Sequence, residues 1–177
     1  MTGAKPARRK IVTPRALTAA VRAAQRRGRR VVFTNGCFDL LHVGHIRYLE
    51  QAKRLGDLLV VAVNTDRSVR RIKGPHRPVV PQAQRAEVVA ALGCVDYVTL
   101  FSTPTPQPLI ARVRPDILVK GADWSVNQIE GKAEVEASGG KVRTIPLTKG
   151  SSTTRLIEKI STLRGKSGLE GQQRIKD

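Results

Sequence analysis

The sequence of 177 residues has few aromatic side chains, few cysteines and no long hydrophobic run. One Trp, two Tyr and three Phe leave little material for the aromatic platform on which single-stranded nucleic acids stack. Cys37 and Cys94 lack the spacing of metal ligands, so we expect two reduced thiols in a cytoplasmic protein. No apolar stretch approaches the roughly 20 residues of a transmembrane helix or follows the basic N-terminus as in a secretory signal. We therefore expect neither a disulfide scaffold nor a membrane protein.

Carboxylates are also scarce, since the sequence has only 14 Asp and Glu residues compared with 32 Lys and Arg residues. The formal net charge is +18 and the pI is about 11.2. Residues 1–30 contain Lys and Arg but no acidic side chain. Such a charge attracts polyanions of every size, from nucleic acids to triphosphates and sugar phosphates. Since aromatic residues are scarce, we expect small phosphorylated partners rather than nucleic acid.

The length and a hydrophobic content of 40% are typical of one globular domain. We place this domain at residues 11–163, between a basic disordered tail at 1–10 and a frayed tail at 164–177. A leading helix is expected within residues 11–28. Thr13 is a good N-cap for it, Pro14 suits its first position and Gly28 ends it.

Short apolar runs then alternate with helical patterns. Runs typical of buried strands are found at 31–34, 58–64, 95–100, 117–119 and 141–147. Helical spacing is found at 44–55, 81–92, 106–113, 131–137 and 153–163, and a long loop is expected at 65–80. We therefore predict an α/β fold, a Rossmann-like doubly wound parallel sheet of five strands with helices on both faces. Ligands of such folds bind beyond the carboxyl ends of the strands, where the strand order reverses.

The segment NGCFDLLHVGH, residues 35–45, follows the first expected strand and opens the next helix. Gly36 permits a tight turn close to a ligand, and the start of a helix attracts phosphate through its free N–H groups. His42 and His45 project on the same side, and Gly44 leaves room for a nucleotide between them. Two imidazoles in this position can donate hydrogen bonds to phosphate oxygens that gain charge in a transition state.

Simpler interpretations exist for these residues. A single histidine near a helix start is usually a surface or cap residue. Asp39 fits equally a helix cap or a ligand that holds Mg²⁺ on phosphates. Zinc is not expected, because no further Cys, His or carboxylate completes a four-ligand site. The pairing of two histidines beside a glycine, between a strand and a helix, favours a functional role.

The segment GCFDLLHVGH resembles the GxFDxxHxGH element of the cytidylyltransferase-like nucleotidyltransferases. The second element of that family resembles GSSTT, residues 150–154, where hydroxyl and N–H groups at a helix start can bind phosphate. Alone, that segment would be read as plain N-capping. IKGPHRPVVPQAQRAEVVAAL and VRPDILVKGADW are similar to one subgroup, the heptose 1-phosphate adenylyltransferases. This subgroup also forms the C-terminal half of a bifunctional heptose kinase/adenylyltransferase.

The resemblance covers about residues 11–161 and does not include the kinase half, so we expect the kinase step on another polypeptide. It implies catalytic roles for His42, His45 and Lys73. The nucleotide-binding residues that it implies are Asn35, Gly36, Cys37, Phe38, Gly44, Lys120, Gly121, Asp123, Ser151, Ser152, Thr153 and Thr154. The substrate-binding residues are expected to be Asp39, Arg77, Arg85 and Trp124, with Asp39 also the candidate Mg²⁺ ligand.

Some of these assignments have an alternative that the sequence leaves open. Lys73 and Arg77 also fit a solvated basic loop. Trp124 fits packing as well as a nucleotide pocket, and Arg85 fits a solvated turn.

The reaction that the resemblance implies joins ATP to D-glycero-D-manno-heptose 1-phosphate. It yields ADP-heptose, a precursor of cell-surface polysaccharide, and pyrophosphate, and it uses Mg²⁺. No covalent intermediate is expected, because no nucleophile–base pair is evident, and a homodimer is the default assembly. One alternative is cytidylyl or guanylyl transfer to another sugar or alcohol phosphate, such as glycerol 3-phosphate with CTP. Another is a non-catalytic nucleic-acid-binding protein, which only the basic N-terminus supports.

Overall fold

A five-stranded parallel sheet forms the centre of the computed structural model, which describes residues 6–148 and 150–170. The strands are β1 (Val31–Gly36), β2 (Leu58–Asn64), β3 (Tyr97–Phe101), β4 (Ile117–Gly121) and β5 (Lys141–Ile145). Their order in the sheet is β3-β2-β1-β4-β5, and every neighbouring pair is parallel. The Rossmann-like prediction is confirmed. The order reverses between β1 and β4, so a ligand crevice is expected beyond the ends of these two strands.

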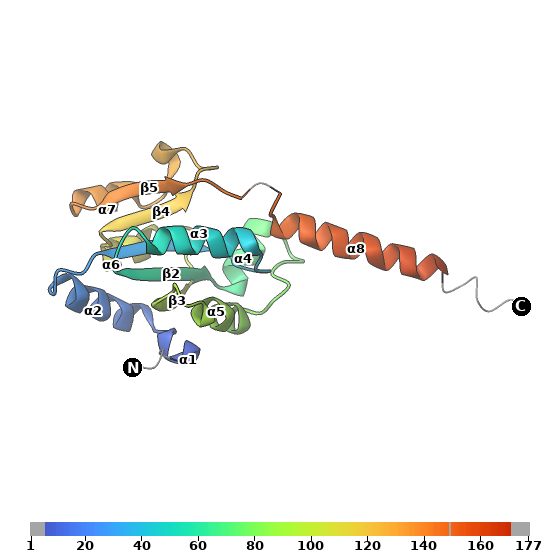
Figure 1. Ribbon diagram of the computed structural model, residues 1–177, viewed down its shortest axis with the longest axis horizontal. Helices are drawn as coiled ribbons and strands as arrows, with labels where there is room; N and C mark the ends of the chain where they lie inside the picture. The colour runs from blue at the N-terminus through green and yellow to red at the C-terminus, as the bar shows by residue number, and fades with distance from the viewer. Residues whose placement is uncertain (1–5, 149, 171–177) are drawn as a thin grey trace, which may run out of the picture.

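Helices cover both faces of the sheet (Figure 1). They are α1 (Ala7–Lys10), α2 (Pro14–Gln25), α3 (Val43–Lys53), α4 (Asp66–Lys73), α5 (Gln82–Ala91), α6 (Gln107–Val113), α7 (Lys132–Ala137) and α8 (Thr153–Glu170), with the 3-10 helix η1 (Val126–Gln128). Apolar residues of α2, α6 and α7 pack on one face, and those of α3 and α5 on the other. Neighbouring strand residues such as Val32 and Phe33 are buried on opposite faces, which explains why the strands read as continuous apolar runs.

The leading helix forms as its sequence signals predict. The Thr13 hydroxyl accepts a hydrogen bond from the N–H of Ala16 at 3.2 Å, and Pro14 occupies the first helical position. Leu17 is fully buried against the sheet. Gly28 follows the helix with φ +72°, a conformation that glycine adopts without strain.

Residues 65–80, expected as a loop, instead contain the helix α4. The Thr65 hydroxyl accepts a hydrogen bond from the N–H of Ser68, and Gly74 ends the helix with φ +96°. Val69 is fully buried, while most of the other residues of α4 are exposed. The expected loop is therefore shorter and runs from the end of α4 to the start of α5.

Both ends of the chain also differ from expectation. Part of the basic tail expected to be disordered forms α1, because the Lys10 ammonium donates to the carbonyl of Leu92 and α1 packs on α5. Residues 1–5 and 171–177 lie outside the described residues. Helix α8 does not stop at Leu163 but continues to Glu170, and it projects from the body of the domain (Figure 1). Within the described ranges, no helix has the length and apolarity needed to cross a membrane.

Candidate active site

Two segments more than a hundred residues apart in the sequence meet beyond the end of β1. The Thr153 hydroxyl, at the start of α8, donates a hydrogen bond to the carbonyl of Leu40 at 3.0 Å. A Cβ atom on Gly44 would lie 3.0 Å from the Cβ of Ser151 and 3.0 Å from the His42 ring. A glycine at position 44 thus allows the start of α8 to approach the start of α3. The N-termini of both helices, with their free N–H groups, are brought to one place.

The two histidines of this segment stack on each other at the start of α3. Their ring centroids are 3.9 Å apart and the ring planes differ by 27°. The backbone N–H of His42 donates to Nδ1 of His45 at 3.4 Å. Because Nδ1 of His45 accepts this bond, the proton of its neutral ring lies on Nε2. Nδ1 of His42 is buried and has no partner among the described residues.

Burial keeps both rings neutral. It lowers the pKa of His42, and it lowers the pKa of His45 to about 4, with the neighbouring His42 as the second cause. At neutral pH each ring therefore carries one N–H donor and no charge. Such a donor can bind a phosphate oxygen when the substrate arrives.

Because the pKa of His45 is lowered, the free energy of unfolding should depend on pH. The unfolded chain takes up this proton near pH 6.5, but the folded chain does so only near pH 4. The free energy of unfolding should therefore fall as the pH falls from about 6.5 to about 4, and His42 acts in the same direction. His45→Gln should weaken this pH dependence, whereas His76→Gln, at an exposed position, should leave it unchanged. Urea unfolding across this pH range measures the effect, and equal slopes for wild type and His45→Gln would contradict it.

Cations from three other segments surround the end of β1. Lys120, near the end of β4, is half-buried, and desolvation lowers its pKa to about 8 while Glu130, Cys37 and Asp123 oppose the shift. The pKa of the Cys37 thiol is raised by burial, and the charges of Lys73, Arg85 and Arg77 act against this rise. Lys73 at the end of α4, Arg77 after it and Lys120 thus lie near one thiol. They are gathered at the end of the sheet where the strand order reverses, which is the place of the expected ligand crevice.

The loop after β4 brings Trp124 to the surface of this crevice. Nζ of Lys120 lies 6.0 Å from the centroid of the Trp124 ring, and the tryptophan is 49% exposed. This exposure disfavours core packing as the reason for its presence. A Cβ atom on Gly121 would lie 2.5 Å from Oδ1 of Asp123, so a larger residue at this position would displace the Asp123 side chain.

The turn after β1 is closely packed. A Cβ atom on Gly36 would lie 3.0 Å from the Phe38 ring, and Phe38 itself has φ +46°. Phe38 in turn packs against His45, with the ring centroids 5.4 Å apart. Oδ1 of Asn35 is buried without a partner among the described residues, so a ligand donor could satisfy it.

The environment of Asp39 contradicts its predicted role as a Mg²⁺ ligand and substrate contact. Its carboxylate accepts hydrogen bonds from Nε of Arg77 at 2.7 Å and from the N–H groups of Val79 and Val80, and its side chain is 1% exposed. Burial alone would raise its pKa, but the bonds from Val80, Val79 and Arg77 outweigh burial, and the pKa is lowered. A carboxylate whose oxygens are occupied in this way does not fit a Mg²⁺ ligand or a contact to the sugar phosphate. Asp39 instead ties the loop before α5 to the turn before α3.

Arg85 also proves to be a structural residue rather than a substrate contact. Its side chain is 0% exposed, and Nε donates to the carbonyl of Val80 at 2.8 Å. The other nitrogens donate to the carbonyls of Cys37 and Asn64 and to the carboxylate of Asp66. The guanidinium therefore joins the turn after β1, the end of β2, the start of α4 and the loop before α5. No group of three or more His, Cys, Asp or Glu residues within the described ranges could hold a metal ion.

Sequence reasoning did not identify the anchor of α3. The hydroxyl of Tyr48 lies 2.8 Å from the hydroxyl of Thr34, which is fully buried in β1. Tyr48 stands three positions after His45, on the same side of the helix. That spacing was the one available signal, and it indicates that this bond fixes the rotation of α3 under the histidines.

A profile of the cytidylyltransferase-like family matches residues 33–159. "Bifunctional protein HldE" of Citrifermentans bemidjiense is 52% identical over 158 residues, which are 89% of this chain and 32% of that protein. The protein of the same name from Syntrophotalea carbinolica is 57% identical over 136 residues, 77% of this chain and 28% of that protein. The chain spans about a third of the length of the curated relatives it matches.

Two solved structures share the fold. The crystal structure of the lipopolysaccharide core biosynthesis protein from Thermoplasma volcanium superposes with a TM-score of 0.58 and 32% identity, over 70% of this chain and 100% of that one. A protein of unknown function from Archaeoglobus fulgidus superposes with a TM-score of 0.54 and 22% identity, over 68% of this chain and 93% of that one, and shows the fold alone. The family match and the curated relatives together identify a nucleotidyltransferase. The chain belongs to the cytidylyltransferase-like family.

Proposed function

We propose that the chain transfers an adenylyl group from ATP to D-glycero-D-manno-heptose 1-phosphate and releases pyrophosphate. An oxygen of the sugar phosphate attacks the α-phosphorus of ATP, and the bond to the β-phosphate oxygen breaks in line. The hydrogen bond from Thr153 to Leu40 carries this proposal, because it brings together the two segments that are expected to bind phosphate. The sequence resemblance to heptose 1-phosphate adenylyltransferases and the similarity to HldE support the choice of substrates.

The residues of the crevice suit this reaction. The neutral rings of His42 and His45 can donate hydrogen bonds to oxygens that gain charge as the α-phosphorus is attacked. We expect Lys73 and Lys120, both of which interact electrostatically with the Cys37 thiol, to neutralise the triphosphate and the departing pyrophosphate. No covalent enzyme intermediate is needed for this displacement.

Magnesium belongs to the proposal only as the companion of ATP. Since the carboxylate of Asp39 is occupied, we propose that Mg²⁺ is bound through the phosphate oxygens of the nucleotide. The reaction is proposed to take place in the cytoplasm, where ATP and sugar phosphates are present.

The proposed function is tested by incubating the purified chain with ATP, CTP, GTP or UTP, each with Mg²⁺ and a sugar phosphate. The acceptors are D-glycero-D-manno-heptose 1-phosphate in both anomers and glycerol 3-phosphate. We expect pyrophosphate release to be fastest with ATP and one heptose anomer, and mass spectrometry to show ADP-heptose. Faster turnover of CTP with glycerol 3-phosphate would replace this proposal by the cytidylyl alternative. No pyrophosphate from any combination would overturn it.

Thr153→Val tests the contact between the two segments. The substitution keeps the size of the side chain but leaves the carbonyl of Leu40 without its donor. We expect kcat/KM for the nucleotide to fall about fivefold, the effect of about 1 kcal/mol for one hydrogen bond. Thr162→Val is the matched control, because the Thr162 hydroxyl donates to the carbonyl of Glu158 within α8 and not to the segment before α3. Equal kinetics of the two variants would contradict the role of this contact.

A further inference from the structure

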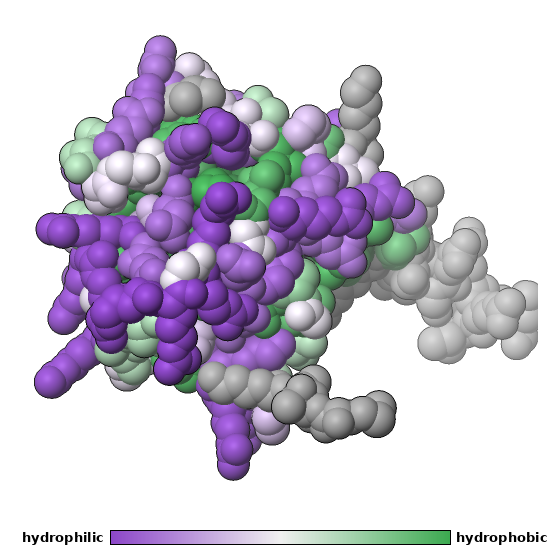
Figure 2. Space-filling model, turned by 60° about the vertical axis from the view of Figure 1, so that its left-hand side comes forward, coloured by the Kyte–Doolittle hydropathy of each residue, from purple (hydrophilic) through white to green (hydrophobic). Residues whose placement is uncertain are grey.

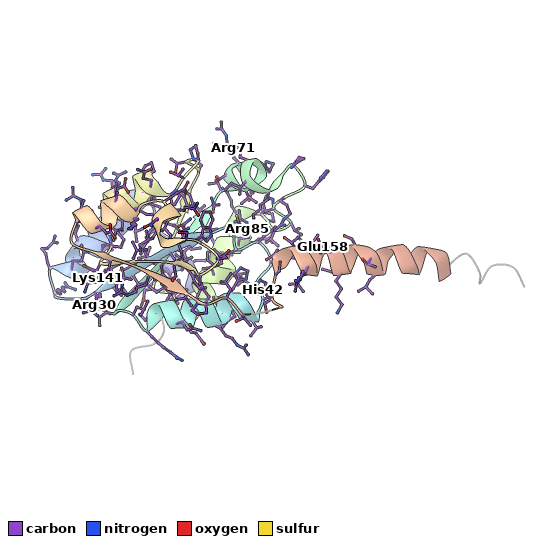
Figure 3. The ribbon with its side chains drawn as sticks, turned by 90° about the horizontal axis from the view of Figure 1, so that it is seen from above. Arg30, His42, Arg71, Arg85, Lys141 and Glu158 are labelled. Atoms are coloured by element: carbon purple, nitrogen blue, oxygen red, sulfur yellow. The ribbon has the colours of Figure 1, made fainter. Side chains whose placement is uncertain are left out.

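A second hollow opens at the opposite edge of the sheet, where β1, β4 and β5 begin. It has a volume of about 570 Å³ and is lined by Arg29 and Arg30 ahead of β1 and by Lys141 and Arg143 on β5. In Figure 3 the labels of Arg30 and Lys141 lie on the side of the molecule away from His42. Figure 2 brings this side forward and shows hydrophilic side chains over most of it. The hollow is therefore separate from the crevice that holds the histidines.

The four basic side chains of the hollow, Arg29, Arg30, Lys141 and Arg143, are not neutralised. All four are exposed, and none of them forms an ion pair within the part of the chain that the structure describes. The hydrogen bonds found for Arg29 and Arg143 go to backbone carbonyls.

One carboxylate, Asp116, also lines the hollow, but it is already engaged. Its Oδ2 accepts hydrogen bonds from the N–H of Val31 at 2.7 Å and from Nε2 of Gln25 at 3.3 Å. Beside the hollow, Oδ2 of Asp57 accepts a hydrogen bond from the N–H of Arg30 at 2.7 Å. Four basic side chains therefore face two carboxylates that are already hydrogen-bonded, and the hollow keeps a net positive charge.

Two ordinary explanations account for part of this charge. Cations near the end of α2 are favoured by the helix dipole, and Arg29 follows the end of that helix closely. Charged residues on an edge strand such as β5 discourage pairing with other chains. Neither explanation accounts for the convergence of cations from two separate elements on one concave surface. A shared anionic ligand does.

We propose that this hollow, which we call the basic groove, binds a phosphate-rich anion. Its volume lies in the range of about 300–1,000 Å³ that is typical of small-ligand sites. Guanidinium groups bind phosphate oxygens in pairs, and three of the four cations are arginines. The described lining contains no aromatic residue, so the groove recognises the phosphates and not a stacked base. The phosphate groups come either from a free polyphosphorylated compound or from the headgroups of anionic lipids. The proposal is independent of the reaction at the histidines.

Titration calorimetry with inorganic tripolyphosphate tests the groove. The wild-type chain should show two sites, one blocked by ATP and one not. The double variant Arg30→Ser/Lys141→Ser should lose at least tenfold in affinity at the ATP-insensitive site. The control Arg15→Ser/Lys159→Ser removes the same charge from exposed positions on α2 and α8 outside the groove and should retain both sites. Basal pyrophosphate release should be unchanged in both double variants.

The source of the phosphate is identified with vesicles of phosphatidylcholine, with or without phosphatidylglycerol. If the wild-type chain sediments with the anionic vesicles and Arg30→Ser/Lys141→Ser does not, the site binds lipid headgroups. If the wild-type chain binds tripolyphosphate but does not sediment with these vesicles, the site binds a free compound. Three results would overturn the proposal. Tripolyphosphate could bind only where ATP competes, both double variants could weaken equally, or a short DNA duplex could be the sole probe that requires the groove.

Discussion

Replacing His42 with alanine should lower kcat by about 10²- to 10³-fold, the cost of losing one hydrogen-bond donor to a transition-state oxyanion. His42 stands at the start of α3 with its ring stacked on His45, and burial keeps it neutral. The hydrogen bond from a neutral donor strengthens most when charge develops on the phosphate oxygen in the transition state. His42→Ala should therefore lower kcat more than it raises KM. Steady-state pyrophosphate release at varied ATP concentrations measures the two constants.

His76→Ala is the matched control for this experiment. His76 is the third histidine of the sequence, lies in the loop after α4 and is exposed. Its replacement should leave kcat within about threefold of wild type, and thermal unfolding of both variants should show an intact fold. If His42→Ala turned over as fast as His76→Ala, the stacked histidines would not act on the reacting phosphate, and the role assigned to this end of the sheet would fail.

The sheet and the meeting of the two segments could be expected from local patterns. The runs at β1 and β2 are apolar on both faces, and Thr13 with Pro14 marks a helix start in almost any context. The position of the crevice followed from topology, because a parallel sheet whose order reverses places its strand ends together. These features depend either on short stretches of sequence or on the general rule that ligands bind where the strand order of a parallel sheet reverses.

The parts that could not be predicted depend on contacts distant in sequence. Helix α4 is short and strongly polar, with Val69 and Ile72 as its apolar residues, so its composition favoured a loop and only its caps, Thr65 and Gly74, signalled a helix. Asp39 and Arg85 looked like polar residues free to bind a substrate. Apart from Val80, which is five residues from Arg85, their partners lie 19 to 48 residues away in the sequence, and only the fold shows that their polar atoms are already occupied. A charged residue near a crevice therefore counts as a candidate contact only when its hydrogen bonds are not already used.

Arg85→Ala should produce the largest loss of stability, about 3–5 kcal/mol, which is typical when one partner of a buried charge pair is removed. The substitution leaves the carboxylate of Asp66 and the carbonyls of Val80 and Asn64 without their donor. It also releases the turn that begins at Cys37. Equilibrium unfolding in urea measures the loss, and Arg85→Lys, which keeps the charge but not the planar fork, should fall between wild type and alanine.

The comparison that isolates burial is with Arg8, whose Nε lies 2.9 Å from a carboxylate oxygen of Glu87. The side chain of Arg8 is 82% exposed, whereas that of Arg85 is 0% exposed, so water replaces the lost partner only at Arg8. Arg8→Ala should therefore leave the unfolding midpoint close to that of wild type. If the two alanine variants unfolded at the same urea concentration, the guanidinium of Arg85 would not hold the four segments together. Arg85 would then again be a candidate contact to the substrate, and the KM of Arg85→Ala for the sugar phosphate would test that role.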